Sequence, residues 1–368
     1  MNLSKIAIII GTRAEYIKMF PIMLELQKNG EDYCFIHTGQ HNLQDLCEIF
    51  GTKEPDIILS PAPNKSSKFN TKESKAIKWS IKTMFKIRKE LKCLPNLEYV
   101  LYHGDTMSTG IAAVGSSKLL NWFKGYKNVH LEAGLRSWNI KEPFPEEIIR
   151  RVVTRFSDIL ITPSKEAEKN LKSTKETYAF GNTILDSVNL ALKIAEERKI
   201  KPLSENKFVL VTIHRHENIK DKDRLNKIVE ILSSINLPIF FSLHDNTKKK
   251  LIEFDLYDKI IKKPNIHIIN SLSYISFIYQ MSKCSLILCD GGSMQEESLI
   301  FQKPCIILRM NTERQEGLKS NFQYLSKLNV EKTKEKIKEY SSSNFNVTNF
   351  KNPYGQVGIS KRIMEVLK

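Results

Sequence analysis

The sequence predicts an α/β protein of two doubly wound domains, each a parallel sheet with helices on both faces. Three observations predict this fold. The chain has 368 residues, about twice the length of a usual domain. Short β-branched runs alternate with helical patterns, and the same rhythm starts again after Lys207. With 41% hydrophobic and 27% charged residues, the composition is that of a globular protein.

In the first half of the chain, five β-branched runs are predicted to be strands. These runs cover residues 5–10, 32–38, 98–103, 128–133 and 158–164. Apolar residues at helical spacing between them predict helices such as 17–29 and 108–123. This alternation is typical of βαβ units, and it therefore indicates a parallel sheet covered by helices.

The second half repeats the pattern with five further strands. They cover residues 208–214, 238–244, 265–270, 285–290 and 305–310. A Lys/Pro/Ser-rich piece at 198–206 belongs to the passage between the halves. We expect an N-terminal domain over 1–170, completed by a C-terminal helix over about 355–368, and a second domain over 171–354.

A polar cluster follows each of several strands at its carboxyl end, where doubly wound sheets bind their ligands. In the first half these clusters read GTRAEYIK, HTGQH, HGDT and EAGLR, and in the second half HRHEN, SLHDN, DGGSMQEE and RMNTERQE. Since all of them follow strand ends, the sequence predicts one site in a cleft where the two domains face each other.

Some of these clusters also have simpler interpretations. Arg13 and Lys18 lie five residues apart across a strand-to-helix junction, so they either reach a phosphate or form a surface charge pair. The turn at 104–106 could be only a helix cap. The motif at 290–297 is more specific, because two glycines and a serine that open a helix form a nest of N–H groups for a phosphate. Glu297 would then reach a ribose, whereas helix capping alone is the alternative.

Several classes of protein are disfavoured. The net charge is +16, but the lysines are spread over amphipathic helices, which favours a solvated surface over a nucleic-acid groove. No apolar run approaches the roughly 18 residues of a membrane span, and no signal peptide is evident, so we expect a cytoplasmic protein without a membrane partner. Six scattered cysteines indicate reduced thiols. Neither GxGxxG nor HExxH occurs, so no cofactor and no metal are expected.

Taken together, the motifs resemble the UDP-N-acetylglucosamine 2-epimerase family of the non-hydrolysing type, in order and spacing from residue 5 to about 320. The resemblance implies the GT-B arrangement of two Rossmann-like domains and a UDP-sugar substrate. It also implies a homodimer formed through the N-terminal domain. The helical patterns at 73–94 and 111–123 could provide the surface, or they could equally belong to the core.

The resemblance assigns the sugar-side residues motif by motif. GTRAEYIK is similar to the family's GTRPExIK, which gives Arg13 and Lys18 substrate-contacting roles. HGDT makes Asp105 the first catalytic carboxylate, HLEAGLR makes Glu132 the second, and PFPEE makes Glu146 the third.

The nucleotide-side residues are likewise implied by the resemblance. HRHEN places the catalytic His214 near the diphosphate. The other implied nucleotide contacts are His244 and Phe277 on the uracil side, Gly291, Gly292 and Ser293 in the phosphate nest, Glu297 on the ribose, and Arg314 of TERQE.

The family's chemistry agrees with these residue types. The proton on sugar C2 is not next to a carbonyl group, so its removal requires elimination of UDP to a 2-acetamidoglucal, followed by re-addition. That route needs carboxylates on both faces of the ring. It also needs positively charged protein groups that contact the departing diphosphate. Crowding three carboxylates should raise the pKa of at least one of them.

The chain departs from the family pattern at a few positions, and alternatives stay open. Ala14 replaces a proline, as is frequent in hydrolysing relatives that release N-acetylmannosamine and UDP. Ile149 replaces an asparagine, which would alter a hydrogen bond near the sugar. Epimerisation of a UDP-2,3-diacetamido uronic acid, a glycosyltransferase and a silent UDP-sugar-binding module are further alternatives. Of the remaining acids, Glu147 is expected to cap or face the helix and Glu142 to be solvated.

Overall fold

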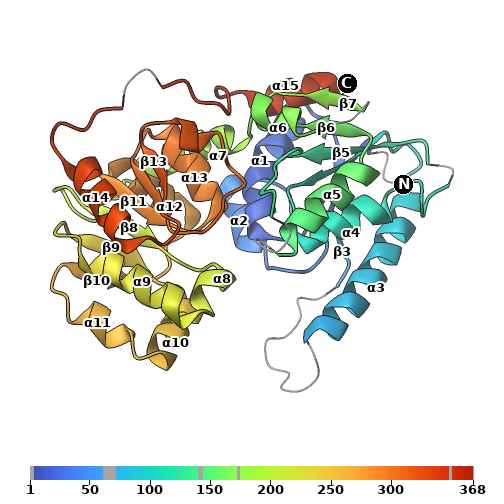
Figure 1. The fold of residues 1–368 in the computed structure, drawn as a ribbon. Coiled ribbons are helices and arrows are strands. Elements are labelled where there is room, and N and C mark those ends of the chain that lie inside the picture. Colours follow the sequence, from blue (N-terminus) through green and yellow to red (C-terminus); the bar gives the residue numbers. More distant parts are fainter. Residues whose placement is uncertain are drawn as a thin grey trace. The chain divides into compact units, whose positions relative to one another are not determined.

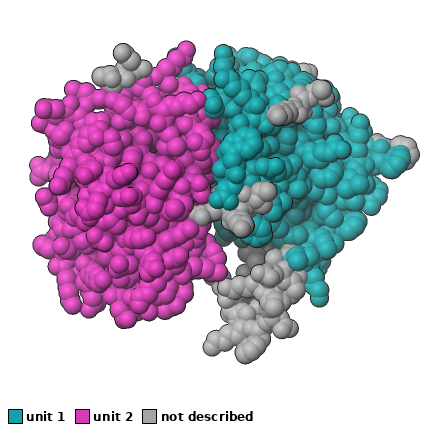
Figure 2. All heavy atoms as spheres, in the orientation of Figure 1, with its two compact units in different colours: residues 1–187, 354–368 teal, residues 188–353 magenta. Residues whose placement is uncertain are grey.

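The computed structural model divides into two compact units, each built on its own parallel sheet (Figures 1 and 2). It describes residues 4–60, 72–122, 124–139, 144–171, 175–347 and 350–367. Unit 1 comprises Met1–Ser187 with Tyr354–Lys368, and unit 2 comprises Val188–Pro353. The α/β class with two doubly wound sheets is thereby confirmed.

The division between the units lies within helix α7, later in the chain than the expected residue 170. Helix α7 spans Ile184–Glu197. The reason for the later division is strand β7 (Glu176–Tyr178), which still pairs with the first sheet and therefore extends unit 1.

Unit 1 holds a seven-stranded sheet in the order β3-β2-β1-β4-β5-β6-β7, with every neighbouring pair parallel. Its other strands are β1 (Ile6–Ile10), β2 (Tyr33–His37), β3 (Ile57–Ile58), β4 (Tyr99–His103), β5 (Lys127–Leu131) and β6 (Ile159–Ile161). The chain runs outward from β1 to β3 and returns to β4 on the other side. The strand order therefore reverses between β1 and β4, which is where such sheets bind ligands.

Some helices of unit 1 begin at a residue whose side chain caps them. The helices of this unit are α1 (Arg13–Lys28), α2 (Gln44–Phe50), α3 (Lys72–Lys92), α4 (Met107–Gly115), α5 (Glu146–Phe156), α6 (Lys165–Lys169) and α15 (Ile359–Val366). Helix α1 starts with a capping box between Thr12 and Glu15. Helix α4 ends at Gly115, well before the expected residue 123, because the Asn121 side chain donates to the Gly115 carbonyl at 2.8 Å.

The C-terminal helix α15 belongs to unit 1, where it packs on α1. The Asp186 carboxylate holds its start by accepting hydrogen bonds from the backbone N–H of Gly358 at 2.6 Å and from that of Ser360 at 2.7 Å. Helix α15 is thus tied to α7, because Asp186 belongs to α7.

Unit 2 holds a six-stranded parallel sheet in the order β10-β9-β8-β11-β12-β13. Its strands are β8 (Val209–Thr212), β9 (Ile239–Ser242), β10 (Ile266–Ile269), β11 (Leu286–Cys289), β12 (Cys305–Ile307) and β13 (Gln323–Leu325). Its helices are α8 (His216–Ile219), α9 (Lys222–Ser233), α10 (Asp245–Glu253), α11 (Tyr257–Ile261), α12 (Tyr274–Lys283), α13 (Gly292–Ile300), η1 (Gly317–Lys319) and α14 (Val330–Ser341). Here the order reverses between β8 and β11, so the ligand position is expected beyond these two strands.

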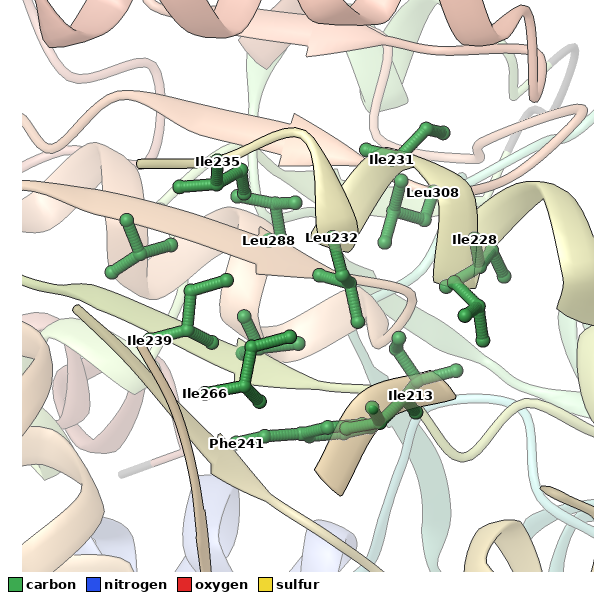
Figure 3. Close-up of a cluster of buried hydrophobic side chains, with 14 of the residues drawn as sticks. Ile213, Ile228, Ile231, Leu232, Ile235, Ile239, Phe241, Ile266, Leu288 and Leu308 are labelled. Atoms are coloured by element: carbon green, nitrogen blue, oxygen red, sulfur yellow. The ribbon is translucent and has the colours of Figure 1, made fainter. Parts of the chain in front are cut away.

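A large hydrophobic cluster of unit 2 lies where α9 covers one face of the sheet (Figure 3). Ile228, Ile231 and Leu232 of α9 meet Phe241 and Leu288 from the strands, and all five are at most 1% exposed. Burial of this kind contributes about 25 cal/mol per Å² of apolar surface and holds the strand ends in place. In the described part of the chain, no helix is long and apolar enough to cross a membrane.

Candidate active site

Glu132 stands just beyond β5 in a left-handed backbone conformation, with φ of 66°. Lys18 of α1 donates a hydrogen bond to Glu132 Oε1, and both side chains are only 6% exposed. The amide of Asn182 also donates to this oxygen, at 3.4 Å. A positive φ is costly for a glutamate, and costly backbone conformations cluster at functional sites, so this geometry makes Glu132 a candidate functional residue.

Asp105 follows β4, the neighbour of β5 in the sheet. The preceding Gly104 has φ of 73°, and a Cβ atom added there would lie 3.4 Å from Glu132 Oε2. Glu132 therefore stands over the turn that carries Asp105. The structure brings together these two predicted carboxylates at the reversal of strand order in unit 1.

Asp105 is ion-paired with Arg150 of α5, with 2.5 Å between Oδ2 and Nη2. Arg150 Nη1 also donates to Glu147 Oε2 at 3.1 Å. Glu147 is completely buried and accepts a hydrogen bond from the backbone N–H of Ser137 at 3.0 Å. Glu147 does not cap α5, but it does face this helix as expected, because its buried carboxylate pairs with Arg150.

Glu146, the third predicted carboxylate, is the first residue of α5 and is half-buried. It lies four residues before Arg150, so the two side chains project from the same side of the helix. Glu142 lies outside the described residues.

Arg13 is the first residue of α1 and forms a bidentate pair with Asp45 of α2, with both N–O distances at 2.7 Å. Its side chain is 46% exposed. Lys18 differs, since it is buried against Glu132. The two basic residues assigned to the substrate thus have different surroundings.

Glu15 organises the loop after β1, and the sequence analysis did not single it out. Its carboxylate accepts from the backbone N–H groups of Gly11 and Thr12 at 2.7 Å each, and from the hydroxyl of Thr109 at 2.7 Å. Burial raises the pKa of this carboxyl, against the opposing effect of these hydrogen bonds. The T-x-x-E capping box at 12–15 is the signal that could have revealed it.

In unit 2, His214 follows β8 and lies beside Asp290, which follows β11. The buried Asp290 carboxylate accepts from the backbone N–H groups of His214 at 3.0 Å and Arg215 at 2.9 Å. The amide of Asn218 donates to the same carboxylate at 3.1 Å. Asp290, which the sequence analysis quoted only as part of a motif, therefore fixes the loop that carries His214.

The amino end of α13 is the predicted phosphate nest, with Gly291 as N-cap and Gly292 as first residue. A Cβ atom added at Gly291 would lie 3.2 Å from His214 Cε1, and one added at Gly292 would lie 2.7 Å from Arg314 Nη1. His214 and Arg314 therefore both reach the nest, and the half-buried Ser293 follows it. Free N–H groups, the helix dipole and a guanidinium at one point suit an anion.

Buried carboxylates hold Arg314 in place. Its Nε donates to Glu296 at 2.9 Å, and its Nη1 donates to Glu313. Glu297, the predicted ribose ligand, is 2% exposed and lies near the Tyr274 hydroxyl. Burial, together with the Glu297 carboxylate, raises the pKa of Tyr274.

The two residues predicted on the uracil side lie in different settings. The His244 ring is 5.0 Å from that of His214, measured between centroids, and burial followed by the charge of His214 lowers its pKa. Phe277 is half-buried and packs against the core cluster of β8, β11 and β12. Among the residues that the structure describes, no group of three or more His, Cys, Asp or Glu side chains is placed to hold a metal ion.

Comparison with known proteins decides the family. The family model described as UDP-N-acetylglucosamine 2-epimerase matches residues 24–368. The chain belongs to the UDP-N-acetylglucosamine 2-epimerase family.

Three members of this 2-epimerase family illustrate the similarity. A UDP-N-acetylglucosamine 2-epimerase of Methanocaldococcus jannaschii is 35% identical, covering 99% of this chain and 98% of the relative. A crystal structure of the M. jannaschii UDP-GlcNAc 2-epimerase with UDP-GlcNAc and UDP covers 98% of this chain and 99% of that one, at 32% identity and a TM-score of 0.82. A UDP-2,3-diacetamido-2,3-dideoxy-D-glucuronate 2-epimerase of Pseudomonas aeruginosa is 32% identical, covering 84% of each chain.

One departure from the 2-epimerase motif has a structural explanation. Ile149 is 8% exposed and belongs to the core cluster that also contains Val153. Its Cγ2 lies 3.3 Å from where a Cβ atom of Gly110 on α4 would stand. This side chain of the 2-epimerase motif therefore joins α5 to α4 by apolar packing.

Proposed function

We propose that the protein epimerises C2 of a UDP-N-acetylhexosamine, converting UDP-N-acetylglucosamine to UDP-N-acetylmannosamine for cell-surface polysaccharide. The pair of carboxylates at the reversal of strand order in unit 1, Asp105 and Glu132, is the observation that carries this proposal. Each has its own buried cation, Arg150 and Lys18 respectively. A module that only binds UDP-sugars needs no such pair.

The proposed reaction is an elimination followed by re-addition. A carboxylate takes the proton from C2, the C1–O bond breaks with its electron pair leaving on UDP, and a C1–C2 double bond forms. UDP then adds back to C1 while a proton reaches C2 from the opposite face. We assign the proton transfers to Asp105, Glu132 and Glu146, because positioned carboxyl groups are effective acids and bases.

We assign the binding of UDP to unit 2. The amino end of α13 suits the diphosphate, with His214 and Arg314 beside its first turn. Glu297 is assigned to the ribose, and His244 and Phe277 to the uracil side. Arg13 and Lys18 of unit 1 are assigned to the substrate, Lys18 acting through its bond to Glu132.

An NMR experiment in deuterated water tests the proposal. The protein is incubated with UDP-N-acetylglucosamine, and the Asp105→Asn variant serves as control. Deuterium at C2 together with UDP-N-acetylmannosamine supports epimerisation. Free N-acetylmannosamine would instead indicate the hydrolysing reaction, which Ala14 in the first loop favours. Absence of C2 exchange with every UDP-sugar tried would rule out both the epimerising and the hydrolysing reaction.

A second candidate substrate is a UDP-2,3-diacetamido uronic acid. The P. aeruginosa relative named for such a substrate, at 32% identity, is the observation that favours it. The same NMR experiment with this nucleotide sugar separates the two candidates, because the preferred substrate exchanges its C2 proton faster at equal concentration.

We further propose that the protein is a homodimer. Ile77, Ile81 and Phe85 form an exposed apolar stripe along α3 at successive turns, with exposed fractions of 60%, 49% and 48%. A stripe of this spacing is typical of a helix that packs against another surface. It belongs to the segment 73–94, for which the sequence left a dimer surface and a core position equally open.

We propose a cytoplasmic location, because the cysteine thiols form no disulfides. Cys34, Cys47, Cys93, Cys284, Cys289 and Cys305 are all free. Cys289 and Cys305 lie with their sulfur atoms 3.7 Å apart and carry no disulfide. Proteins of a reducing compartment rarely carry disulfides, which agrees with these free thiols.

A further inference from the structure

A chain of buried charges connects Asp105 at the end of β4 with helix α5. Arg150 contacts Asp105 through Nη2 at 2.5 Å and Glu147 through Nη1 at 3.1 Å. The exposed fraction of the side chain is 4% for Arg150 and 0% for Glu147. The guanidinium therefore bridges two carboxylates inside the protein.

Glu147 is fixed independently of Arg150. Its Oε2 accepts from the backbone N–H of Ser137 at 3.0 Å and from the Ser137 hydroxyl at 3.2 Å. The contact of its other oxygen, Oε1, with Arg151 at 3.3 Å adds little to this anchoring, because the Arg151 side chain is 50% exposed. Because Glu147 is anchored to the loop after β5, it holds the guanidinium in one orientation, and Arg150 in turn holds Asp105.

Stability alone is a poor reason for this arrangement. Removing charges from water costs about as much as their attraction returns, so apolar residues would serve a core equally well. Asp105, at the outer end of this row of charges, differs from Arg150 and Glu147, because its side chain is still 24% exposed. The arrangement thus presents one accessible carboxylate on a rigid, buried support.

We propose that Arg150 is a positioning residue that holds the Asp105 carboxylate in its reactive orientation, with Glu147 as its anchor. This inference rests on the proposed function, in which Asp105 takes part in proton transfer at C2. The planar fork of arginine fixes the carboxylate plane through charge-assisted bonds, which lysine cannot reproduce. Misplacement of a reacting group by about 1 Å can cost about 100-fold in rate.

Arg151 provides the matched control. It contacts the same Glu147, at 3.3 Å, but its side chain is 50% exposed. Arg151→Ala therefore removes one cation from the same helix and the same carboxylate. Arg150 and Arg151 carry the same charge and are neighbours on α5, but only Arg150 pairs with Asp105. A difference in activity between their variants therefore reports on the contact with Asp105.

The experiment measures kcat and KM for UDP-N-acetylglucosamine epimerisation in Arg150→Lys, Arg150→Ala and Arg151→Ala. We expect kcat to fall by about 100-fold in Arg150→Ala and at least about tenfold in Arg150→Lys, with KM within about threefold of the parent. Arg151→Ala should keep kcat within about threefold. Added guanidinium should restore part of the kcat of Arg150→Ala. A folded Arg150→Lys with full kcat, equal losses at both positions, or no restoration by guanidinium would overturn the proposal.

Crystal structures of Arg150→Lys and Arg151→Ala provide a readout independent of activity. The Asp105 carboxylate should leave its present orientation in the first variant and keep it in the second. An unchanged Asp105 in Arg150→Lys contradicts the positioning role. If the unaltered protein exchanges no C2 proton in any UDP-sugar, the proposed function fails, and the structures alone then decide whether Arg150 orients Asp105.

Discussion

Lys18 of α1 donates a hydrogen bond to Glu132, which stands beyond β5, and each side chain is only 6% exposed. Helix α1 thereby joins the end of a strand two places away in the sheet, since β4 lies between β1 and β5. Glu132, whose backbone has a positive φ, is thus also tied to a cation from the first helix of the chain.

The first prediction concerns this buried pair. Lys18→Met removes the cation that donates to Glu132 Oε1, and we expect the free energy of unfolding to fall by about 3–5 kcal/mol, as for other buried pairs that lose one partner. Urea unfolding measures the loss. The double variant Lys18→Met/Glu132→Gln should recover part of it, because the second change removes the buried charge. Strictly additive losses would contradict the pairing.

Gly292→Ala should weaken the binding of UDP. The new Cβ atom would lie 2.7 Å from Arg314 Nη1 and 2.9 Å from Glu313 Oε1, so Arg314 must move at the amino end of α13. We expect at least about a tenfold rise in the Kd for UDP, since one displaced charge-assisted contact is worth about 1.5–3 kcal/mol. Calorimetric titration measures it. Gly125→Ala, where the Cβ atom meets nothing within 4 Å, is the control and should bind as the parent does.

His130 should make the protein less stable in acid. Burial lowers the pKa of His130 from 6.5 to about 4, although its Nε2–H donates to the Gly104 carbonyl at 2.9 Å. Between these two pH values the unfolded chain binds the proton and the folded chain does not, so stability falls as the pH falls through this range. The loss amounts to roughly 3 kcal/mol, at about 1.4 kcal/mol per pH unit.

Thermal unfolding between pH 7 and pH 4 measures this effect. His130→Gln should flatten the dependence on pH, whereas His267→Gln, at an exposed position on β10, should leave it unchanged. Parallel curves for the parent and His130→Gln would show that other groups cause the acid sensitivity.

Ile81→Glu should disrupt the proposed homodimer. Ile81 is the middle residue of the apolar stripe on α3, and a buried carboxylate without a partner opposes association. Light scattering after size-exclusion chromatography should give a dimer for the parent and a monomer for the variant. Ile252→Glu, at a 54% exposed position on α10, is the control and should leave the mass unchanged. A parent that is monomeric at every concentration rejects the dimer.

Much of the fold could be predicted because its signals are local. Runs such as 5–10 and 208–214 carry their β-branched pattern within a few residues, and both contain strands of the two parallel sheets. The short strands β3, β7 and β13 were not predicted, since two or three residues at a sheet edge carry too little pattern. The end of α4 was missed because the Asn121 side chain, six residues beyond Gly115, decides it.

The residues of the candidate site could be indicated by the sequence, but their contacts could not. Residue type alone pointed to the nest at 291–293, because two glycines and a serine follow a predicted strand there, whereas Asp105 and Glu132 were chosen through the resemblance of their motifs to the family. The partners of these residues could not be chosen by spacing. Lys18 and Glu132 are 114 residues apart in the chain, and His214 and Asp290 are 76 apart.

Local pattern therefore specifies which strands and helices form, and which acidic and basic residues stand at the strand ends. Only the tertiary structure decides that Lys18 meets Glu132, that Arg150 bridges Asp105 and Glu147, and that Glu147 is buried. The physical reason is that strand order and helix packing bring distant segments together. The pairing of two charges depends on that proximity and on the exclusion of water, neither of which appears in a short stretch of sequence.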